Sequence, residues 1–186
     1  MKTTEIIETG KLLLADPFML DPNFKRSVVL LCDHHSEGTV GFILNKSVKM
    51  QINELLADFP EFESEVHFGG PVQTDTIHYI HRIGEKLIES QHVCDGIYWG
   101  GDFDQLKFLV ETGQVDSADI RFFVGYSGWS SGQLNEEMAI GSWMLGNASA
   151  SYVFKKEIGD LWSEVLQEKG DVFSVISTLP DYVNWN

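Results

Sequence analysis

The stretch from Arg121 to Glu137 reads RFFVGYSGWSSGQLNEE, and the rest of the chain is expected to serve as its scaffold. It begins as an apolar run, passes through a segment with three glycines and two aromatic residues, and ends in a polar run suited to the start of a helix. Glycine lets a backbone take positive φ or approach another group closely. We therefore predict a strand over 120–124, then a tightly folded corner, and then a short helix that continues over 136–140.

The composition fits one domain over residues 1–186, or at most a domain with a small lobe. Hydrophobic residues make up 43% of the chain and aromatic residues 12%, which is enough for a sizeable core. Lys and Arg number 13 against 28 Asp and Glu, so the formal net charge is −15. Because such a chain repels phosphate backbones unless it carries a local basic patch, direct binding to nucleic acid is not expected.

The two cysteines, Cys32 and Cys94, form no CxxC pair and cannot make a four-ligand zinc site without histidines. The first residues carry an acid with no long apolar core behind them, and the apolar runs are far too short for a membrane span. We expect a soluble, reduced, cytoplasmic protein with no membrane contact and with both thiols in or near the core.

Short apolar runs bounded by turn formers predict buried strands, and apolar residues at i, i+3 and i+4 predict helices. Strands outnumber helices and come in runs, so we predict an α+β fold with a mainly antiparallel, curled sheet and a hairpin over 27–44. The predicted strands are 11–15, 27–32, 39–44, 77–82, 93–99, 120–124 and 142–145. The predicted helices are 52–59, the segment between an Asp102 cap and Gly113, 136–140 and 158–166.

Gly128 to Gly132 matches the G-x-S-x-G motif and lies between a predicted strand and a predicted helix. A hydrolase of that class needs its histidine after the serine, yet all six histidines precede Ser130 in the chain. We therefore favour a glycine-shaped corner with surface serines. Another order of triad residues stays open, because triads are defined by geometry.

The polar stretch from Cys32 to Glu37 contains residue types that bind metals, but without a second ligand cluster a hairpin loop is the better interpretation. His78 and His81 would face opposite ways on a strand and could not share a metal. We expect His81 to be a hydrogen-bonded, half-buried residue rather than a catalytic base. The glycine turns lack phosphate-loop spacing, so no metal and no cofactor are predicted.

Several phrases spread from about residue 10 to the end form one pattern. They are LLLA at 12–15 with Pro17, Asp21 and Phe24, RSVV at 26–29, His34, GTVGFILN at 38–45, GGPV at 69–72 with His81, GYSGW at 125–129, GQL at 132–134, Glu137, Trp143, Leu161-Trp162, and Pro180 with Asn184. Together they resemble the YqgE/AlgH family of bacterial proteins. This chain departs from the family's common phrase by carrying Ser127, Ser130 and Asn135, which we interpret as surface-type differences.

The resemblance implies a single α+β domain whose bifurcated sheet curls into a pseudo-barrel with helices packed outside. It implies no established enzymatic activity. Some members are labelled transcriptional regulators, although no helix-turn-helix signature is visible here and the net charge opposes contact with DNA.

The preferred hypothesis is a non-catalytic cytoplasmic protein, of uncharacterised function, that binds a protein or small-molecule partner with regulatory consequences. The alternative is a small hydrolase or transferase that uses His81 or Glu137 as a base in a common cleft. Direct DNA binding is a third hypothesis and would require a basic face. The candidate binding residues are Tyr126, Trp129, Gln133 and Glu137, joined by Arg26, Asn45 and His81.

Overall fold

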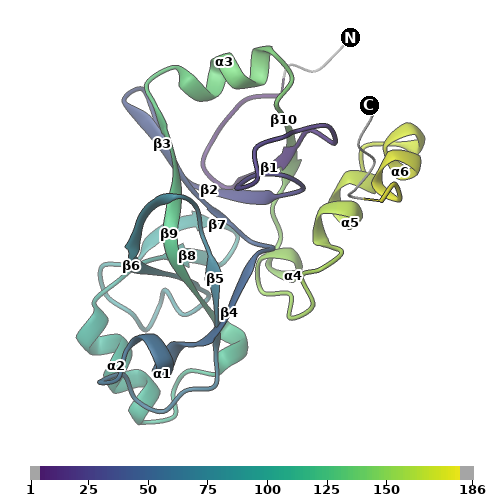
Figure 1. Ribbon diagram of the computed structural model, residues 1–186. Helices are drawn as coiled ribbons and strands as arrows, with labels where there is room; N and C mark the ends of the chain where they lie inside the picture. Colours follow the sequence, from purple (N-terminus) through teal and green to yellow (C-terminus); the bar gives the residue numbers. More distant parts are fainter. Residues whose placement is uncertain (1–4, 181–186) are drawn as a thin grey trace.

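The computed structural model describes residues 5–180, and within them ten strands form one large sheet (Figure 1). The strands are β1 (Lys11–Ala15), β2 (Val28–His35), β3 (Gly38–Ile43), β4 (Ser47–Gln51), β5 (Glu65–Phe68), β6 (Val72–His81), β7 (Gln91–Cys94), β8 (Ile97–Trp99), β9 (Ile120–Ser130) and β10 (Trp143–Asn147). The helices are α1 (Ile52–Leu55), α2 (Phe103–Glu111), the 3₁₀ helix η1 (Ser117–Asp119), α3 (Gln133–Ala139), α4 (Ala150–Val153), α5 (Leu161–Gln167) and α6 (Asp171–Ser177).

The main strand order is β10-β1-β2-β3-β9-β6-β8-β7, with β4 and β5 attached beside β9. Every pairing is antiparallel except that of β5 with β9. The predicted α+β class and mainly antiparallel sheet are confirmed. The sheet is not closed into a barrel, since within the described residues β10 and β7 end the order without pairing to each other.

The sheet forks along β9, the long central strand of Figure 1. The first half of β9 lies between β5 and β6, and its last four residues pair with β3. Gly125 lies at the fork with φ of 65°, and a Cβ there would lie 2.4 Å from the carbonyl oxygen of Gly70. The prediction of a tightly folded corner directly after Val124 is therefore wrong. The backbone continues as a strand to Ser130 and turns only at Gly132, before α3.

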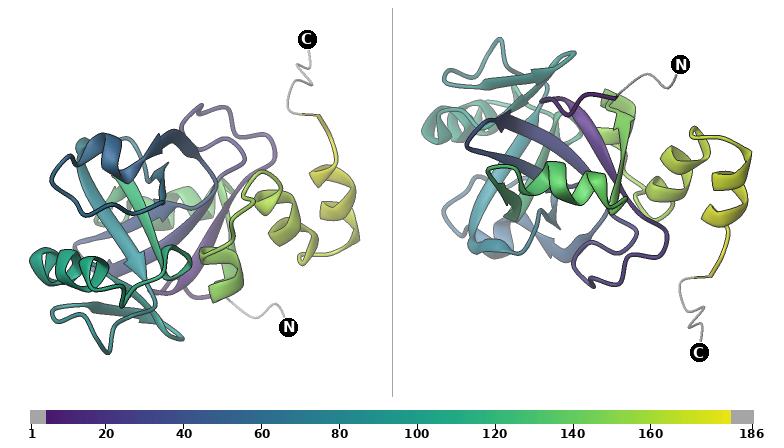
Figure 2. Two further views of the ribbon diagram at one scale, coloured as in Figure 1. Left: turned by 90° about the horizontal axis from the view of Figure 1, so that it is seen from below. Right: turned by 90° about the horizontal axis from the view of Figure 1, so that it is seen from above.

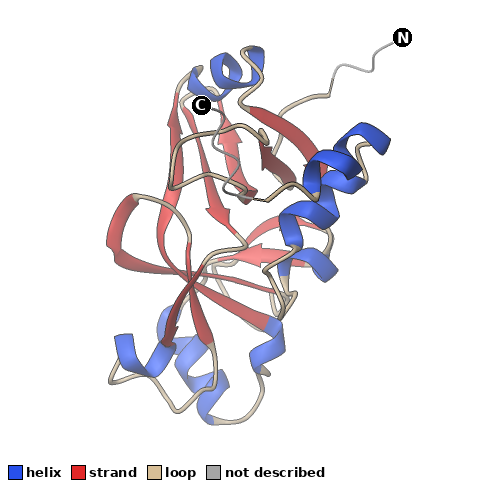
Figure 3. Ribbon diagram, turned by 45° about the vertical axis from the view of Figure 1, so that its right-hand side comes forward, coloured by secondary structure: helices blue, strands red, loops and turns tan. Residues whose placement is uncertain are grey.

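Both faces of the β1–β2–β3 region are buried, which explains its continuous apolar runs. Leu12 and Leu14 face one cluster, which Trp162 and Val165 of α5 cover, whereas Leu13 faces another cluster beneath α3. A third cluster packs α1 and α2 against β6 and the first half of β9. The helices consequently lie outside the sheet, with α4–α6 projecting to one side (Figures 2 and 3).

Two predicted elements differ clearly from the structure. The predicted strand 93–99 is a hairpin of β7 and β8, because Gly96 takes φ of 73° in the turn between them. The predicted helix 52–59 is the single turn α1, and the Asn53 side chain bonds the backbone of Phe59, Pro60 and Phe62 to hold the loop that follows.

The predicted cap of α2 is confirmed at Asp102, whose side chain accepts a hydrogen bond from the Gln105 N–H at 2.7 Å. The Gln105 side chain accepts from the Ile88 N–H instead of returning to the cap. Asn184 lies outside the described residues. No helix in the described part of the chain combines the length and apolar character needed to cross a membrane.

Candidate functional site

Three of the predicted binding residues form one hydrogen-bonded clamp between α3 and the sheet. Glu137 Oε2 accepts from the indole N–H of Trp129 at 3.0 Å and from that of Trp143 at 2.8 Å. Glu137 Oε1 accepts from the Gln133 amide at 3.0 Å. The polar atoms of these side chains already form hydrogen bonds with one another. The clamp therefore joins α3 to β9 and β10 and leaves few free donors or acceptors for a ligand.

Tyr126 lies beside the clamp, where it lines an open groove with a volume of about 360 Å³. Trp129 lines the same groove although only 5% of its surface is exposed. The remaining lining comes from His35, Gly38, Thr39, Val40, Val72 and Gly128. Aromatic rings and glycine backbone thus wall a shallow surface that offers few convergent polar groups.

Arg26 and Asn45 lie close together, and their side chains form hydrogen bonds with backbone groups of the chain. Asn45 accepts from the Val28 N–H at 2.9 Å and donates to the Arg26 carbonyl at 2.8 Å, which supports φ of 51° at Arg26. The Arg26 guanidinium lies 5.0 Å from the ring centre of Trp162 and donates to the Leu179 carbonyl. These residues therefore fasten the C-terminal helices to the sheet.

His81 is fully buried, contrary to the half-buried position expected. Its Nε2 donates to the Gly100 carbonyl at 2.7 Å while its Nδ1 accepts from the Ile83 N–H at 3.2 Å. Burial lowers the pKa of His81, the Gly100 carbonyl partly offsetting this, so the ring is a neutral packing element.

The structure does not bring His81 and Glu137 into a common cleft. His81 pairs with Ile120 at the start of β9, whereas Glu137 binds Trp129 near its end. Nine residues of strand separate these points, or roughly 30 Å along the strand.

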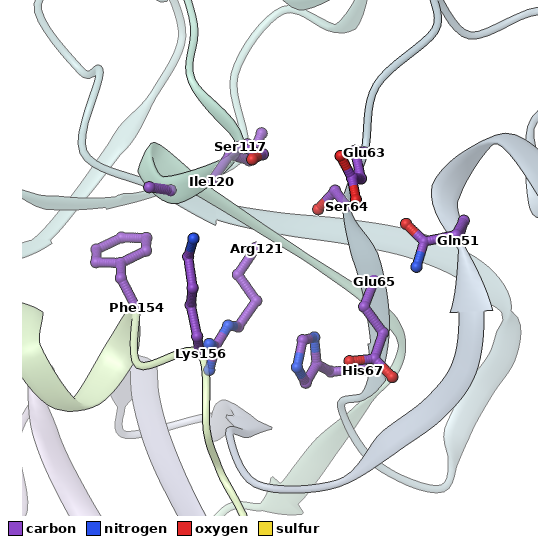
Figure 4. A pocket seen from close by; sticks show the side chains of 11 residues that line it. Gln51, Glu63, Ser64, Glu65, His67, Ser117, Ile120, Arg121, Phe154 and Lys156 are labelled. Carbon is purple, nitrogen blue, oxygen red and sulfur yellow. The ribbon is translucent and has the colours of Figure 1, made fainter.

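A pocket of about 340 Å³ that the sequence did not predict opens between β5, β9 and the segment after α4 (Figure 4). Its lining residues are Gln51, Glu63, Ser64, Glu65, His67, Ser117, Ala118, Ile120, Arg121, Phe154 and Lys156. We call it the Arg121 pocket. Its volume is at the lower end of the range of small-molecule sites.

Arg121 gives the pocket a buried cation. The side chain is 6% exposed and donates to the backbone carbonyls of Leu44, at 3.3 Å, and Lys155. No carboxylate within residues 5–180 forms an ion pair with it. Burial lowers the pKa of Arg121 to about 10, with the Glu65 charge opposing the shift, so the group stays charged at neutral pH at a cost in free energy.

His67 adds a neutral imidazole beside that cation. The residue is 6% exposed, and its Nδ1 is buried without a hydrogen-bond partner in the described chain. Burial, followed by the Arg121 charge, lowers the pKa of His67 to about 4, against smaller opposing effects of Glu65 and nearby backbone carbonyls. A buried polar atom without a partner is uncommon and marks a position where a ligand atom could bind.

One sequence signal could have revealed this pocket. Arg121 is the charged member of the apolar strand run from Ile120 to Val124, and a charge inside a buried strand needs a partner. The spacing of glycine and aromatic residues pointed instead to the far end of the same strand. Among the described residues, the Arg121 pocket included, no group of three or more His, Cys, Asp or Glu side chains could hold a metal ion.

Comparisons with known proteins agree with the fold. The AlgH-like family model matches residues 12–174. A UPF0301 protein of Chlorobaculum tepidum is 43% identical, over 98% of this chain and 97% of its own length, and one of Cytophaga hutchinsonii is 38% identical, over 94% and 97%.

Two solved structures share the architecture. The AlgH protein of Pseudomonas aeruginosa superposes with a TM-score of 0.73 at 25% identity, covering 92% of this chain and 93% of that one. A Corynebacterium diphtheriae protein has a TM-score of 0.74 at 18% identity, with 94% of both chains covered, and supports the fold alone. With the family model matched over most of its length, this chain belongs to the YqgE/AlgH family.

Proposed function

We propose that this protein is a non-catalytic binding protein whose small ligand occupies the Arg121 pocket. One observation carries the proposal: a guanidinium that is 6% exposed has only backbone carbonyls as hydrogen-bond partners and no carboxylate counter-ion in the described chain. A buried charge without a counter-ion is costly, and an anionic group on a ligand would supply one. A carboxylate suits this role because guanidinium binds it through paired hydrogen bonds.

Catalysis is the weaker interpretation of the same pocket. No hydrogen bond joins His67 to the hydroxyl of Ser64 or Ser117 within residues 5–180, so no activated nucleophile is in place. The other base considered, His81, lies in packed core. We therefore infer binding without a bond-breaking step.

The position of the pocket suggests how binding could regulate a partner. Phe154 and Lys156 line it from the segment that leads to α5, and Arg121 already donates to Lys155 in that segment. A ligand held by both walls would tie the C-terminal helices to the sheet. We propose that regulation proceeds in the cytoplasm through a protein or small-molecule partner, since a net charge of −15 opposes direct contact with nucleic acid.

A thermal-shift screen of small carboxylates and phosphates against the full chain tests the proposal. Lys156→Gln removes an exposed cation at the pocket, and Lys86→Gln is the matched control on an exposed lysine outside the pocket lining. We expect at least one compound to raise the Tm of the wild type and of Lys86→Gln, with a smaller rise for Lys156→Gln. If no compound acts, or if all three proteins respond equally, the pocket is not the binding site.

A further inference from the structure

The two walls of the Arg121 pocket carry opposite charges. Arg121 and Lys156 lie on one wall beside Phe154, and Glu63 and Gln51 lie across from them in Figure 4. Lys156 and Glu63 have no ion-pair or hydrogen-bond partner in the described part of the chain, and thus do not neutralise each other. Both groups remain available to a ligand.

Glu65 is less available than Glu63. Its carboxylate accepts from the Ser47 hydroxyl and lies 4.0 Å from the Lys49 ammonium. Its charge nevertheless reaches the pocket, because it opposes the lowering of the pKa of both Arg121 and His67. The acidic wall therefore disfavours ligands with several negative charges, such as polyphosphates.

We propose that the ligand of the Arg121 pocket is a small zwitterion of the amino-acid class, an inference that rests on the proposed binding function. Its carboxylate binds Arg121 and Lys156, and its ammonium binds Glu63 with the Gln51 amide oxygen beside it. The unpartnered Nδ1 of His67 forms a hydrogen bond with a polar atom of the ligand. Phe154 and Ile120 supply apolar contact for a short side chain.

Isothermal titration calorimetry with the standard L-amino acids tests this assignment on the full chain. For the tightest binder, the deaminated acid and the decarboxylated amine are titrated as matched probes. We expect each single-charge probe to bind at least about tenfold more weakly than the zwitterion, because each loses one charge-assisted contact. Glu63→Gln should weaken the amino acid about tenfold and leave the affinity of the deaminated acid unchanged.

Glu61→Gln is the control, since Glu61 is an exposed acid of the same segment that does not line the pocket. Equal binding of the amino acid and its deaminated acid, or equal affinity of Glu63→Gln and wild type, overturns the zwitterion assignment and leaves the pocket proposal standing. If no amino acid binds but simple carboxylates do, the zwitterion assignment is likewise overturned and the pocket proposal stands. Absence of binding by all the amino acids, acids and amines overturns both proposals.

Discussion

Glu137 shows how a residue that looks functional in the sequence can be structural. It was a candidate for ligand binding because it follows a glycine–aromatic stretch, and it accepts instead from Trp129 and Trp143. No sequence pattern shows that two tryptophans fourteen positions apart share one carboxylate oxygen, because that arrangement depends on how β9, α3 and β10 pack. The prediction that Glu137 binds a ligand rests on chain order alone, whereas the partners of its carboxylate are set by tertiary contacts.

Glu137→Ala should therefore lower the free energy of unfolding by about 2–3 kcal/mol, because two indole N–H groups lose their acceptor. Urea denaturation followed by tryptophan fluorescence measures the change. Glu136→Ala, on the same helix but exposed, is the control and should stay within about 0.5 kcal/mol of wild type. Loss of ligand binding with unchanged stability in Glu137→Ala would return this residue to the binding site.

His67 makes the stability of the fold depend on pH in the acidic range. Its pKa is about 4 in the folded protein, whereas a histidine in an unfolded chain has a pKa near 6.5. As the pH falls from about 6.5 to about 4, the His67 imidazole binds a proton in the unfolded chain but stays neutral in the folded protein. Stability is therefore lost over this interval, by up to about 3 kcal/mol from this one residue.

His67→Gln should remove that part of the acid sensitivity. Burial also lowers the pKa of His78 and His81, so a remainder in the same direction stays in the variant. Urea denaturation at pH 7 and at about pH 4.5 measures the difference. The exposed His92→Gln serves as the control, and an identical acid loss in His67→Gln and wild type would refute the assignment.

Among the elements, β9 shows what could and could not be predicted. The strand at 120–124 and the helix near 136–140 follow from apolar runs and a polar helix start, and both are present within longer elements. The break expected after Val124 is absent, because glycine permits two different outcomes: a turn, or a close approach between neighbouring strands. The structure uses Gly125 for the second, with the backbone of Gly70 lying against it.

Gly125→Ala should consequently destabilise the fold by about 2–4 kcal/mol, because the added Cβ meets the Gly70 carbonyl and the residue must keep positive φ. Gly146→Ala in β10 is the matched control: its Cβ would meet neighbours at 3.5 Å or more and should be tolerated. Thermal unfolding by circular dichroism reports both changes. Equal Tm values for the two variants would show that the fork does not depend on Gly125.

Across the whole molecule, arginines of the sheet region hold the C-terminal helical segment. Arg26 contacts Trp162, Arg82 lies 4.3 Å from the ring centre of Phe154, and Arg121 donates to Lys155. The family pattern predicted the fold class because its phrases include residues of β1, β2, β3, β6, β9 and β10. It could not predict the Arg121 pocket, since the lining comes from four separate stretches that only the folded chain brings together.

The central claim is that the charge of Arg121 serves a group outside the chain. Arg121→Met keeps the volume and removes the charge.

The most direct test is the free energy of unfolding of Arg121→Met and wild type, measured by urea denaturation without ligand. Our account predicts a variant that is within about 1 kcal/mol of wild type, or more stable, because the protein then no longer buries a cation that lacks a carboxylate counter-ion in the described chain. A loss of about 3–5 kcal/mol in the free energy of unfolding would contradict it. That is the cost of removing one member of a buried ion pair, so it would mean that Arg121 already has its partner within the chain.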